Sequence, residues 1–323
     1  MADISETHPE TPDTGPSADR AGMYLLTLAR SLESVGDTGR ALALLDLAAS
    51  REIGEADALS LKGDLLRSRG ELRQAAAVFD RLHRRHPDHP RARYLSTLLC
   101  GADTPLPAAR PAPWPGAFVR LEDFLDGARH HELLKLVTRE AREFEPSTVG
   151  GMGANGPEPR VDLGVRASFR LPGIAPIAEW LRPLIAACLP SMSARLGVAP
   201  FPVEVIELKC TAYGDGHFFR VHSDSRHHPT RRISFIYYFH RLPKRYSGGA
   251  LLLYDGDPTD PIRCFLDSVT RLDTLDNSIV FFPSGTHHEV TTVVNPSGRL
   301  EDARFTFAGH VHTPVTAGHT ALS

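Results

Sequence analysis

Short segments rich in β-branched and aromatic residues fill the sequence from Val203 onward. Gly, Pro, Asp and Asn separate these segments, which is the pattern of strands joined by turns. Two helical segments, 121–144 and 175–196, precede them, so we predict an α+β domain in which helices brace a β-sandwich or open barrel. The expected strands are 203–213, 217–222, 232–239, 250–254, 278–282, 289–294 and 304–312.

The first third of the chain has the apolar spacing of helices, and this spacing repeats. Gly36-Asp37 stands 34 residues before Gly70-Glu71, and at the same offset Ala41 falls on Ala75. The period and the Gly…Ala…Phe…Pro order resemble tetratricopeptide repeats (TPR), which implies antiparallel helix pairs joined by a tight turn at Gly. About two repeats fit, with a capping helix at 91–99. Because solenoids usually need about three or more repeats, we expect this unit to lean on the domain that follows.

Composition sets the other boundaries. Residues 1–20 are acidic and rich in Pro, Ser and Thr, with no signal-peptide features, so we expect a disordered N-terminus. The polar, Gly-rich segment 146–159 is expected to form a mobile loop. The domains expected are a disordered N-terminus at 1–20, a small all-α helical-repeat domain at 21–101, a Pro-rich linker at 102–115, a β-rich domain at 116–312 and a C-terminal tail at 313–323.

Charge and cysteine content exclude several classes of protein. The formal net charge is −3, from 36 basic and 39 acidic residues, so nothing indicates a nucleic-acid or membrane partner. No apolar run approaches the roughly 18–20 residues that a membrane helix needs. The four cysteines are dispersed and form no CxxC motif, which argues against a disulfide framework or a cysteine-based zinc site. A reducing cytoplasm is therefore the simplest expected location.

His222-Ser223-Asp224 is the first motif with chemical content. Residues i and i+2 of a strand share a face, so this imidazole and carboxylate are expected to project side by side. His288, which follows the expected strand 278–282, supplies a third ligand, and its neighbour His287 is the alternative. Two His and one carboxylate form the facial triad of non-haem Fe(II) oxygenases, which leaves about three coordination positions open. His310 and His312 alternate on the last expected strand, and we assign them a structural role.

Arg304-x-Thr306 is the second motif. Both side chains share one face of an expected strand, and a guanidinium beside a hydroxyl suits a carboxylate, which Arg can bind through two hydrogen bonds. Arg299, in the turn before this strand, is the alternative anchor. We prefer Arg304 because Thr306 follows it at strand spacing.

Taken together, His222-x-Asp224, His288-Glu289-Val290 and Arg304-x-Thr306 resemble the 2-oxoglutarate/Fe(II)-dependent dioxygenase superfamily, in its prolyl-4-hydroxylase-like branch. The resemblance covers about residues 114–312 and implies a double-stranded β-helix (jelly-roll, cupin-like) core. The spacing between His288 and Arg304 is longer than is usual in the family. The supporting segments, in the family's order, are Tyr213-Gly214, 231–238, 247–251 and 281–284.

This resemblance also implies roles for individual residues. His222, Asp224 and His288 would ligate Fe(II), and no catalytic residue is expected beyond this metal centre. The remaining roles are 2-oxoglutarate binding by Arg304, Thr306, Tyr238 and Tyr213, and substrate contact by Arg231 and Arg166. The cosubstrates implied are 2-oxoglutarate and O₂, with ascorbate as a possible reductant.

The reaction implied is hydroxylation of an unactivated C–H bond, coupled to decarboxylation of 2-oxoglutarate to succinate and CO₂. The branch suggests proline or another amino acid as substrate, either a residue in a peptide or protein or a free cyclic imino or amino acid. The helical repeats could bind a protein partner, form a homodimer contact or only brace the barrel. Two alternatives remain: a TPR-type protein-binding scaffold with a degenerate barrel, and a cupin-like metalloenzyme that does not use 2-oxoglutarate.

Overall fold

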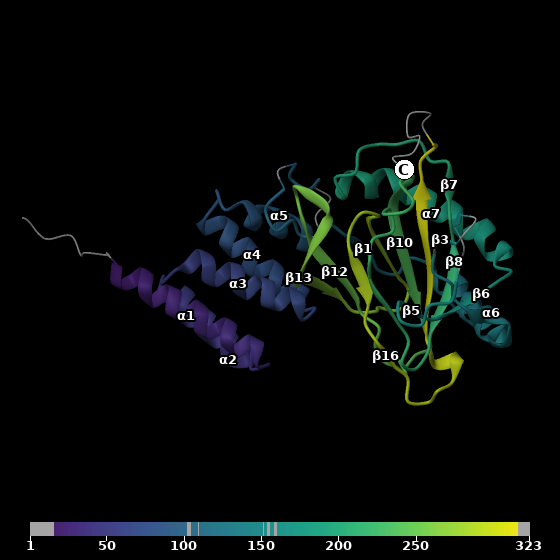
Figure 1. The fold of residues 1–323 in the computed structure, drawn as a ribbon, viewed down its shortest axis with the longest axis horizontal. Helices are drawn as coiled ribbons and strands as arrows, with labels where there is room; N and C mark the ends of the chain where they lie inside the picture. The colour runs from purple at the N-terminus through teal and green to yellow at the C-terminus, as the bar shows by residue number, and fades with distance from the viewer. Residues whose placement is uncertain are drawn as a thin grey trace, which may run out of the picture.

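A computed structural model describes residues 16–101, 105–108, 110–150, 152–153, 156–157 and 160–315. The expected disorder at 1–15, part of the expected mobile loop 146–159 and most of the expected C-terminal tail lie outside the described residues. The chain forms a helical unit at one end and a two-sheet core at the other (Figure 1). Within the described part, no helix combines the length and apolarity that crossing a bilayer requires.

The helical unit, defined here as helices α1 to α5, forms two helix pairs and a final helix. Gly36 and Gly70 occupy equivalent turns and both adopt positive φ, at 81° and 82°, which glycine tolerates best. Ala41 and Ala75 are fully buried between helices, as the repeat predicts. The first helix begins five residues before the expected boundary. The helices are α1 Pro16–Ser34, α2 Thr38–Ser50, α3 Glu55–Ser68, α4 Leu72–Arg85 and α5 Pro90–Leu99.

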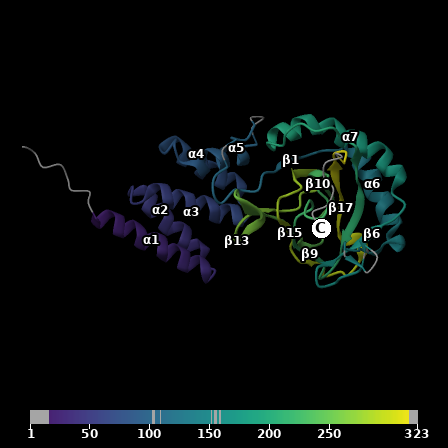
Figure 2. The same ribbon diagram turned by 45° about the horizontal axis from the view of Figure 1, so that its top comes forward.

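The larger sheet of the core is antiparallel and has the strand order β1-β14-β10-β17-β8-β6-β2, with β7 pairing to β17. Helices α6 (Gly127–Arg139) and α7 (Ala175–Arg195) cover this sheet on the side away from the helical unit (Figures 1 and 2). Its strands are β1 Val119–Leu121, β2 Glu145–Pro146, β6 Phe169–Leu171, β7 Val205–Ile206, β8 Lys209–Tyr213, β10 Arg231–Phe239, β14 Ser278–Pro283 and β17 Arg304–His312.

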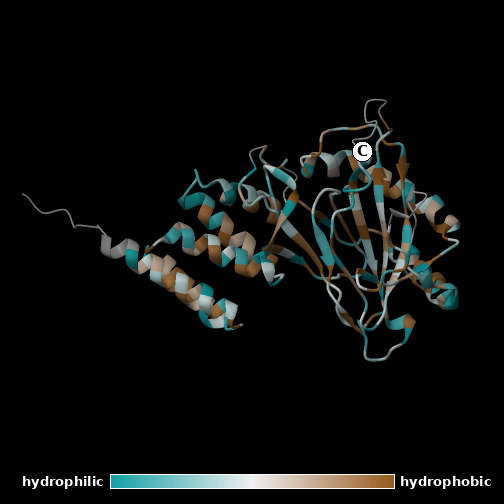
Figure 3. Cartoon of the chain, viewed as in Figure 1, coloured by the Kyte–Doolittle hydropathy of each residue, from teal (hydrophilic) through white to brown (hydrophobic). Residues whose placement is uncertain are grey.

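The smaller sheet has the order β13-β12-β15-β9-β5 and completes the jelly roll. Its strands are β5 Arg166–Ala167, β9 Phe218–His222, β12 Leu251–Asp257, β13 Asp260–Leu272 and β15 His288–Val290. Two short pairs complete the strands: β11 Ser247–Gly248 with β16 Val293–Val294, and β3 Met152–Gly153 with β4 Gly156–Pro157. Apolar and hydrophilic positions alternate along helices and strands in both parts of the molecule (Figure 3).

Several elements differ from those expected. The expected strand 203–213 is divided into β7 and β8, and the expected strand 289–294 is divided between β15 and β16. The helix expected at 121–144 is shorter, because β1 pairs with β14 up to Leu121 and Asp126 then caps α6 by accepting a hydrogen bond from the Arg129 backbone N–H. The long strand β13 was not predicted. Its exposed positions include Ile262 and Leu266, so it lacks the inward and outward alternation of a half-buried strand.

The helical unit and the core share one set of buried apolar residues. Leu95 of α5, Leu253 of β12 and Phe282 of β14 belong to the same cluster. In the described part of the expected linker, Trp114 forms a backbone bridge with Gly256 and donates its Nε1–H to the Tyr94 hydroxyl at 2.9 Å. The unit therefore leans on the core, as its small number of repeats predicts.

A buried histidine makes the stability of the fold depend on pH. His240, just after β10, is 4 % exposed, and its backbone N–H donates to Asp276 Oδ1 at 2.9 Å. Burial lowers the pKa of His240 to about 4, although the Asp276 carboxylate opposes the shift. The folded protein therefore keeps this side chain neutral in a pH range where the unfolded chain, with an ordinary His pKa near 6.5, takes up a proton.

We expect the metal-free protein to lose stability as the pH falls from about 6.5 toward 4, because the unfolded state then binds more protons than the folded state. The contribution of His240 is fully present above pH 6.5 and changes by at most about 1.4 kcal/mol per pH unit below it. Urea unfolding at several pH values, with and without His240→Asn, measures it. Equal acid slopes for both proteins would contradict the prediction.

Candidate functional site

Three potential metal ligands converge where β9 and β15 lie side by side. His222 ends β9, His288 begins β15, and the two residues are paired across the antiparallel ladder. Asp224 Oδ1 lies 3.5 Å from His222 Nε2, and its Oδ2 lies 3.6 Å from His288 Nε2. One ligand atom from each residue lies within 4.8 Å of the other two. The residues predicted from the sequence therefore form a cluster of the size that one metal ion needs.

Backbone contacts orient both imidazoles toward this cluster. His222 Nδ1 lies 2.8 Å from the Arg220 carbonyl oxygen, and His288 Nδ1 lies 2.9 Å from that of Thr286. A carbonyl oxygen only accepts hydrogen bonds, so Nδ1 carries the proton and Nε2 keeps its lone pair for a metal. Burial lowers the pKa of His288 to about 4, so this imidazole is neutral at physiological pH.

Asp224 lies in a turn two residues beyond the end of β9, whereas the i, i+2 spacing suggested that it shares a strand with His222. Its backbone N–H donates to the Ser284 carbonyl oxygen at 3.0 Å, which holds the turn against the end of β14. Burial raises the pKa of Asp224, but the neighbouring His288, His222 and His310 outweigh burial and hold that pKa well below its usual range. The carboxylate is therefore charged and available to a cation.

Sequence reasoning missed the residues that support this carboxylate. Ser234 Oγ donates to Asp224 Oδ2 at 2.7 Å, and it lies 3.2 Å from His310 Nδ1. Ser284 Oγ contacts the same hydroxyl at 2.9 Å. The available signal was one small polar residue, Ser234, inside the otherwise apolar run 233–239.

A buried guanidinium lies in the same cavity as the metal cluster. Arg304, at the start of β17, is 1 % exposed, and its Nε–H donates to the Gly249 carbonyl oxygen at 2.8 Å. Its guanidinium lies 4.7 Å from the ring centre of Tyr213 and 5.0 Å from that of Tyr238. The cavity has a volume of about 90 Å³, and Tyr213, Thr306, Arg304 and all three metal ligands line it.

Two buried donors, one on this guanidinium and one on the Tyr238 ring beside it, are unsatisfied in the part of the chain that the structure describes. Arg304 Nη2 and the Tyr238 hydroxyl are buried, and neither finds a hydrogen-bond partner among the described residues. Among the described residues, no carboxylate forms an ion pair with Arg304. Because buried charges are normally paired, these groups fit a ligand that carries a carboxylate. The ladder places Thr306 opposite Tyr238 and Arg304 opposite Tyr213, so all four residues predicted to hold 2-oxoglutarate lie together. Tyr213, Arg304 and Thr306 line the cavity, whereas Tyr238 lies beside the guanidinium and outside the lining.

The two predicted substrate residues lie in different places. Arg166 lines the cavity; its guanidinium lies 4.8 Å from the centre of the Phe219 ring, which stacks on His222 at 3.7 Å. Arg231 is not among the lining residues. Its side chain donates to Glu207 at 2.9 Å and to the Asp224 carbonyl oxygen at 3.3 Å. Arg231 therefore stabilises the turn that carries Asp224 from outside the cavity.

The two rival residues lie outside the cavity lining. Arg299 is exposed and pairs with Glu301, and the lining of the cavity includes neither Arg299 nor His287. The metal cluster contains His288. The geometry therefore favours His288 as metal ligand and Arg304 as carboxylate anchor.

Two sequence comparisons agree with this geometry. Residues 208–312 match the model of the 2OG-Fe(II) oxygenase superfamily, a stretch that includes the three potential metal ligands and Arg304. The chain is also 36 % identical over 140 residues to an uncharacterized PKHD-type hydroxylase, sll0191, of Synechocystis sp.. That match covers 43 % of this chain and 46 % of the relative, so the chain spans about half the length of the curated relative it matches.

Solved structures with a related arrangement are more distant. A Pseudomonas putida prolyl-4-hydroxylase is 19 % identical with a TM-score of 0.44, covering 62 % of this chain and 94 % of its own. A Trichoplax adhaerens prolyl hydroxylase, in complex with a hypoxia inducible factor peptide fragment, is 16 % identical with a TM-score of 0.45, covering 60 % and 83 %.

Proposed function

Because residues 208–312 match the 2OG-Fe(II) oxygenase superfamily, we propose that the chain is an Fe(II)- and 2-oxoglutarate-dependent dioxygenase that hydroxylates an unactivated C–H bond. One observation carries this proposal: a His-Asp-His cluster and a buried guanidinium lacking a carboxylate partner among the described residues open into the same cavity. A zinc or manganese cupin needs only the first feature. A binding scaffold needs neither.

In this proposal His222, Asp224 and His288 hold Fe(II), and Arg304 with Tyr238 and Thr306 receives the far carboxylate of 2-oxoglutarate. Bound there, iron and 2-oxoglutarate would supply the oxidising power for hydroxylation by O₂, with 2-oxoglutarate converted to succinate and CO₂. The chain's own residues position and shield the reactants. Ser234 orients the Asp224 carboxylate through its hydrogen bond. The backbone carbonyls of Arg220 and Thr286 orient the two imidazoles. The buried ring of Tyr213 beside Arg304 excludes water.

For the substrate we propose an amino acid, proline-like or other, either free or within a peptide. The motifs' resemblance to the prolyl-4-hydroxylase-like branch supports this class, and the likeness to a protein named as a PKHD-type hydroxylase supports hydroxylation as the reaction. Arg166 is the residue we expect to contact the substrate, because its guanidinium reaches the cavity next to the Phe219–His222 stack. We propose a reducing cytoplasmic location, supported by the four cysteines, which are all free.

The test supplies the full chain with Fe(II), 2-oxoglutarate, O₂ and ascorbate. Succinate is then quantified, and mass spectrometry searches a panel of free amino acids and peptides for the gain of one oxygen atom. We expect turnover that His222→Ala reduces to background. Metal binding without 2-oxoglutarate binding would indicate a cupin-like metalloenzyme, and binding of neither would indicate a scaffold. Both results would reject the proposal.

A further inference from the structure

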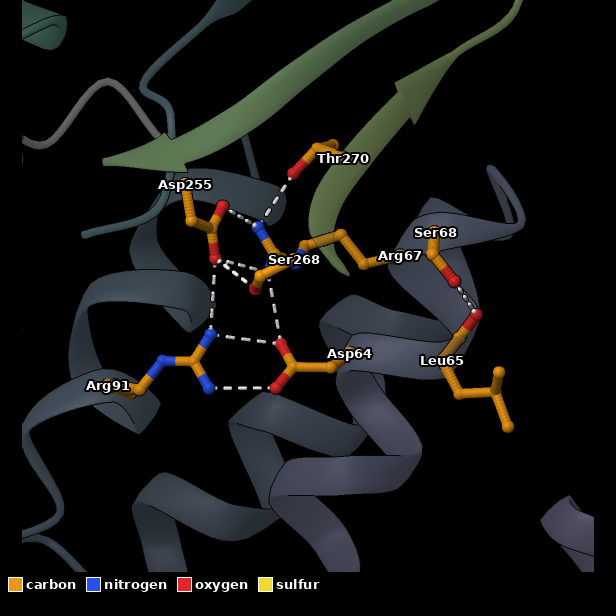
Figure 4. A network of polar contacts seen from close by, with 8 residues as sticks. All are labelled: Asp64, Leu65, Arg67, Ser68, Arg91, Asp255, Ser268 and Thr270. Carbon is orange, nitrogen blue, oxygen red and sulfur yellow. Dashed lines mark hydrogen bonds and ion pairs between the residues drawn. The ribbon is translucent and has the colours of Figure 1, made fainter. Parts of the chain in front are cut away.

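A buried ionic cluster joins the helical unit to the core. Arg67 of α3 and Asp255 of β12 are both fully buried. The guanidinium binds the carboxylate through two hydrogen bonds, from Nη1 to Oδ1 at 2.7 Å and from Nη2 to Oδ2 at 2.6 Å (Figure 4). Two hydroxyl groups of β13 complete the site, because Arg67 also donates to Thr270 Oγ1 at 2.9 Å and Ser268 donates to Asp255 at 2.7 Å.

A second pair of charges surrounds the first. Asp64, on the same helix as Arg67, accepts from its Nη2 at 3.1 Å, and Arg91 of α5 donates to Asp64 at 2.7 Å and to Asp255 at 3.4 Å. Two arginines and two aspartates balance one another, and three belong to the helical unit while Asp255 belongs to the core (Figure 4). The helical unit therefore supplies both cations that compensate the charge of Asp255.

The repeat itself does not require an arginine at this position. One period earlier, the residue equivalent to Arg67 is Glu33, and one period later it is Gly101. A buried ion pair is also a poor route to stability, since apolar residues of similar volume often serve as well or better. What the pair provides is geometry, because a bidentate contact holds two backbones in one relative position.

The backbone held by Arg67 lies next to a metal ligand. Asp255 directly follows Tyr254, whose backbone N–H donates to the His287 carbonyl oxygen at 2.9 Å. In the same ladder Leu253 pairs with His288. Strand β15 has three residues and lies between β12 and β9. Strand β12 is thus one of the two templates that position His288.

We propose that Arg67 is a positioning residue for the metal centre: by clamping Asp255 from the helical unit, it holds β12 in the register that presents His288 to the metal. This proposal rests on the proposed function only for the metal centre, and not for the identity of the reaction. It makes the helical unit a part of the oxygenase site's framework.

The test compares Arg67→Lys with Leu45→Ala. The lysine keeps the charge but cannot form the two parallel hydrogen bonds. Leu45 is buried in α2, which packs against α1 and α3, so its truncation destabilises the helical unit without touching Asp255. The measurements are amide hydrogen exchange of the metal-free protein, Co(II) affinity and thermal unfolding.

We expect Arg67→Lys to speed amide exchange in 251–257 and 288–290 and to weaken Co(II) binding about tenfold, the size typical for losing a residue that orients a metal ligand. Leu45→Ala should lower the unfolding temperature and leave Co(II) affinity unchanged. If Arg67→Lys does not fold, Thr270→Val, which removes one acceptor from Arg67, should give the same pattern more weakly.

Two results would overturn the proposal. In the first, exchange rises in α3 and α5 while 288–290 and Co(II) affinity stay as in the wild type. In the second, both variants weaken Co(II) binding equally, which indicates general destabilisation. Failure of the proposed function looks different: the wild type would bind Co(II) but form no succinate, and the effect of Arg67 on metal binding would still be measurable.

Discussion

Replacing Arg304 by Met is expected to weaken 2-oxoglutarate binding about 100-fold while the protein remains folded. Losing one partner of a buried charge pair costs about 2–5 kcal/mol, and each 1.4 kcal/mol is a factor of ten in affinity. The Met side chain fills much of the same space without leaving a charge behind. Calorimetric titration of 2-oxoglutarate into the anaerobic Fe(II) protein measures the effect.

Arg299→Met is the matched control, because Arg299 is the other candidate anchor and is exposed beside Glu301. It should bind 2-oxoglutarate as the wild type does.

Gly249→Ala gives an intermediate test. A Cβ there would lie 2.6 Å from Arg304 Cδ, at a φ of +67°, and should displace the guanidinium and cost roughly tenfold in affinity. Equal losses in the Arg299 and Arg304 variants would contradict the assignment.

His288→Ala is expected to weaken metal binding by at least about 100-fold and to abolish succinate formation. Loss of a residue that only orients a ligand typically costs 10- to 100-fold, and loss of a ligand should cost more. Co(II) titration followed by absorbance measures the affinity without depending on turnover. Near-ultraviolet circular dichroism shows whether the variant keeps its tertiary packing.

His287→Ala is the control, since this residue is the immediate neighbour and lies outside the metal cluster. Its backbone carbonyl, which accepts from Tyr254, is unaffected by the substitution. Wild-type Co(II) affinity is expected. Loss of metal in the His287 variant, with the His288 variant unaffected, would reverse the assignment.

Much of the core could be predicted because its signals are local. The strand expected at 304–312 matches β17, and the helix expected at 175–196 matches α7 to within one residue. Strand β13 could not be predicted, because its outward positions carry apolar residues and its pairing with β12 contains register shifts. Leu121 pairs with Ile279 instead of starting a helix, and that choice depends on a strand more than 150 residues away.

In the candidate site, too, sequence patterns indicated residues with local signals and missed those that depend on tertiary contacts. Residue types and order indicated the three proposed metal ligands and Arg304, because the proposed chemistry needs these side chains themselves. Their supports are tertiary contacts: Ser284 holds the turn at Asp224, Ser234 holds its carboxylate, and Arg231 faces Glu207 and lies outside the cavity lining. No spacing rule relates these residues, so sequence patterns could not identify them.

The contacts of Asp255 with Arg67 and Arg91 determine whether the core can be separated from the helical unit. By sequence, a cut near residue 102 would release an oxygenase from a helical appendage. In three dimensions that cut would remove both arginines that pair with Asp255, and it would expose this carboxylate together with apolar residues such as Leu253 that are now buried in a cluster shared with the helical unit. A shortened enzyme would therefore present newly exposed apolar surface, and β12 would lose the contacts that hold it against the helical unit.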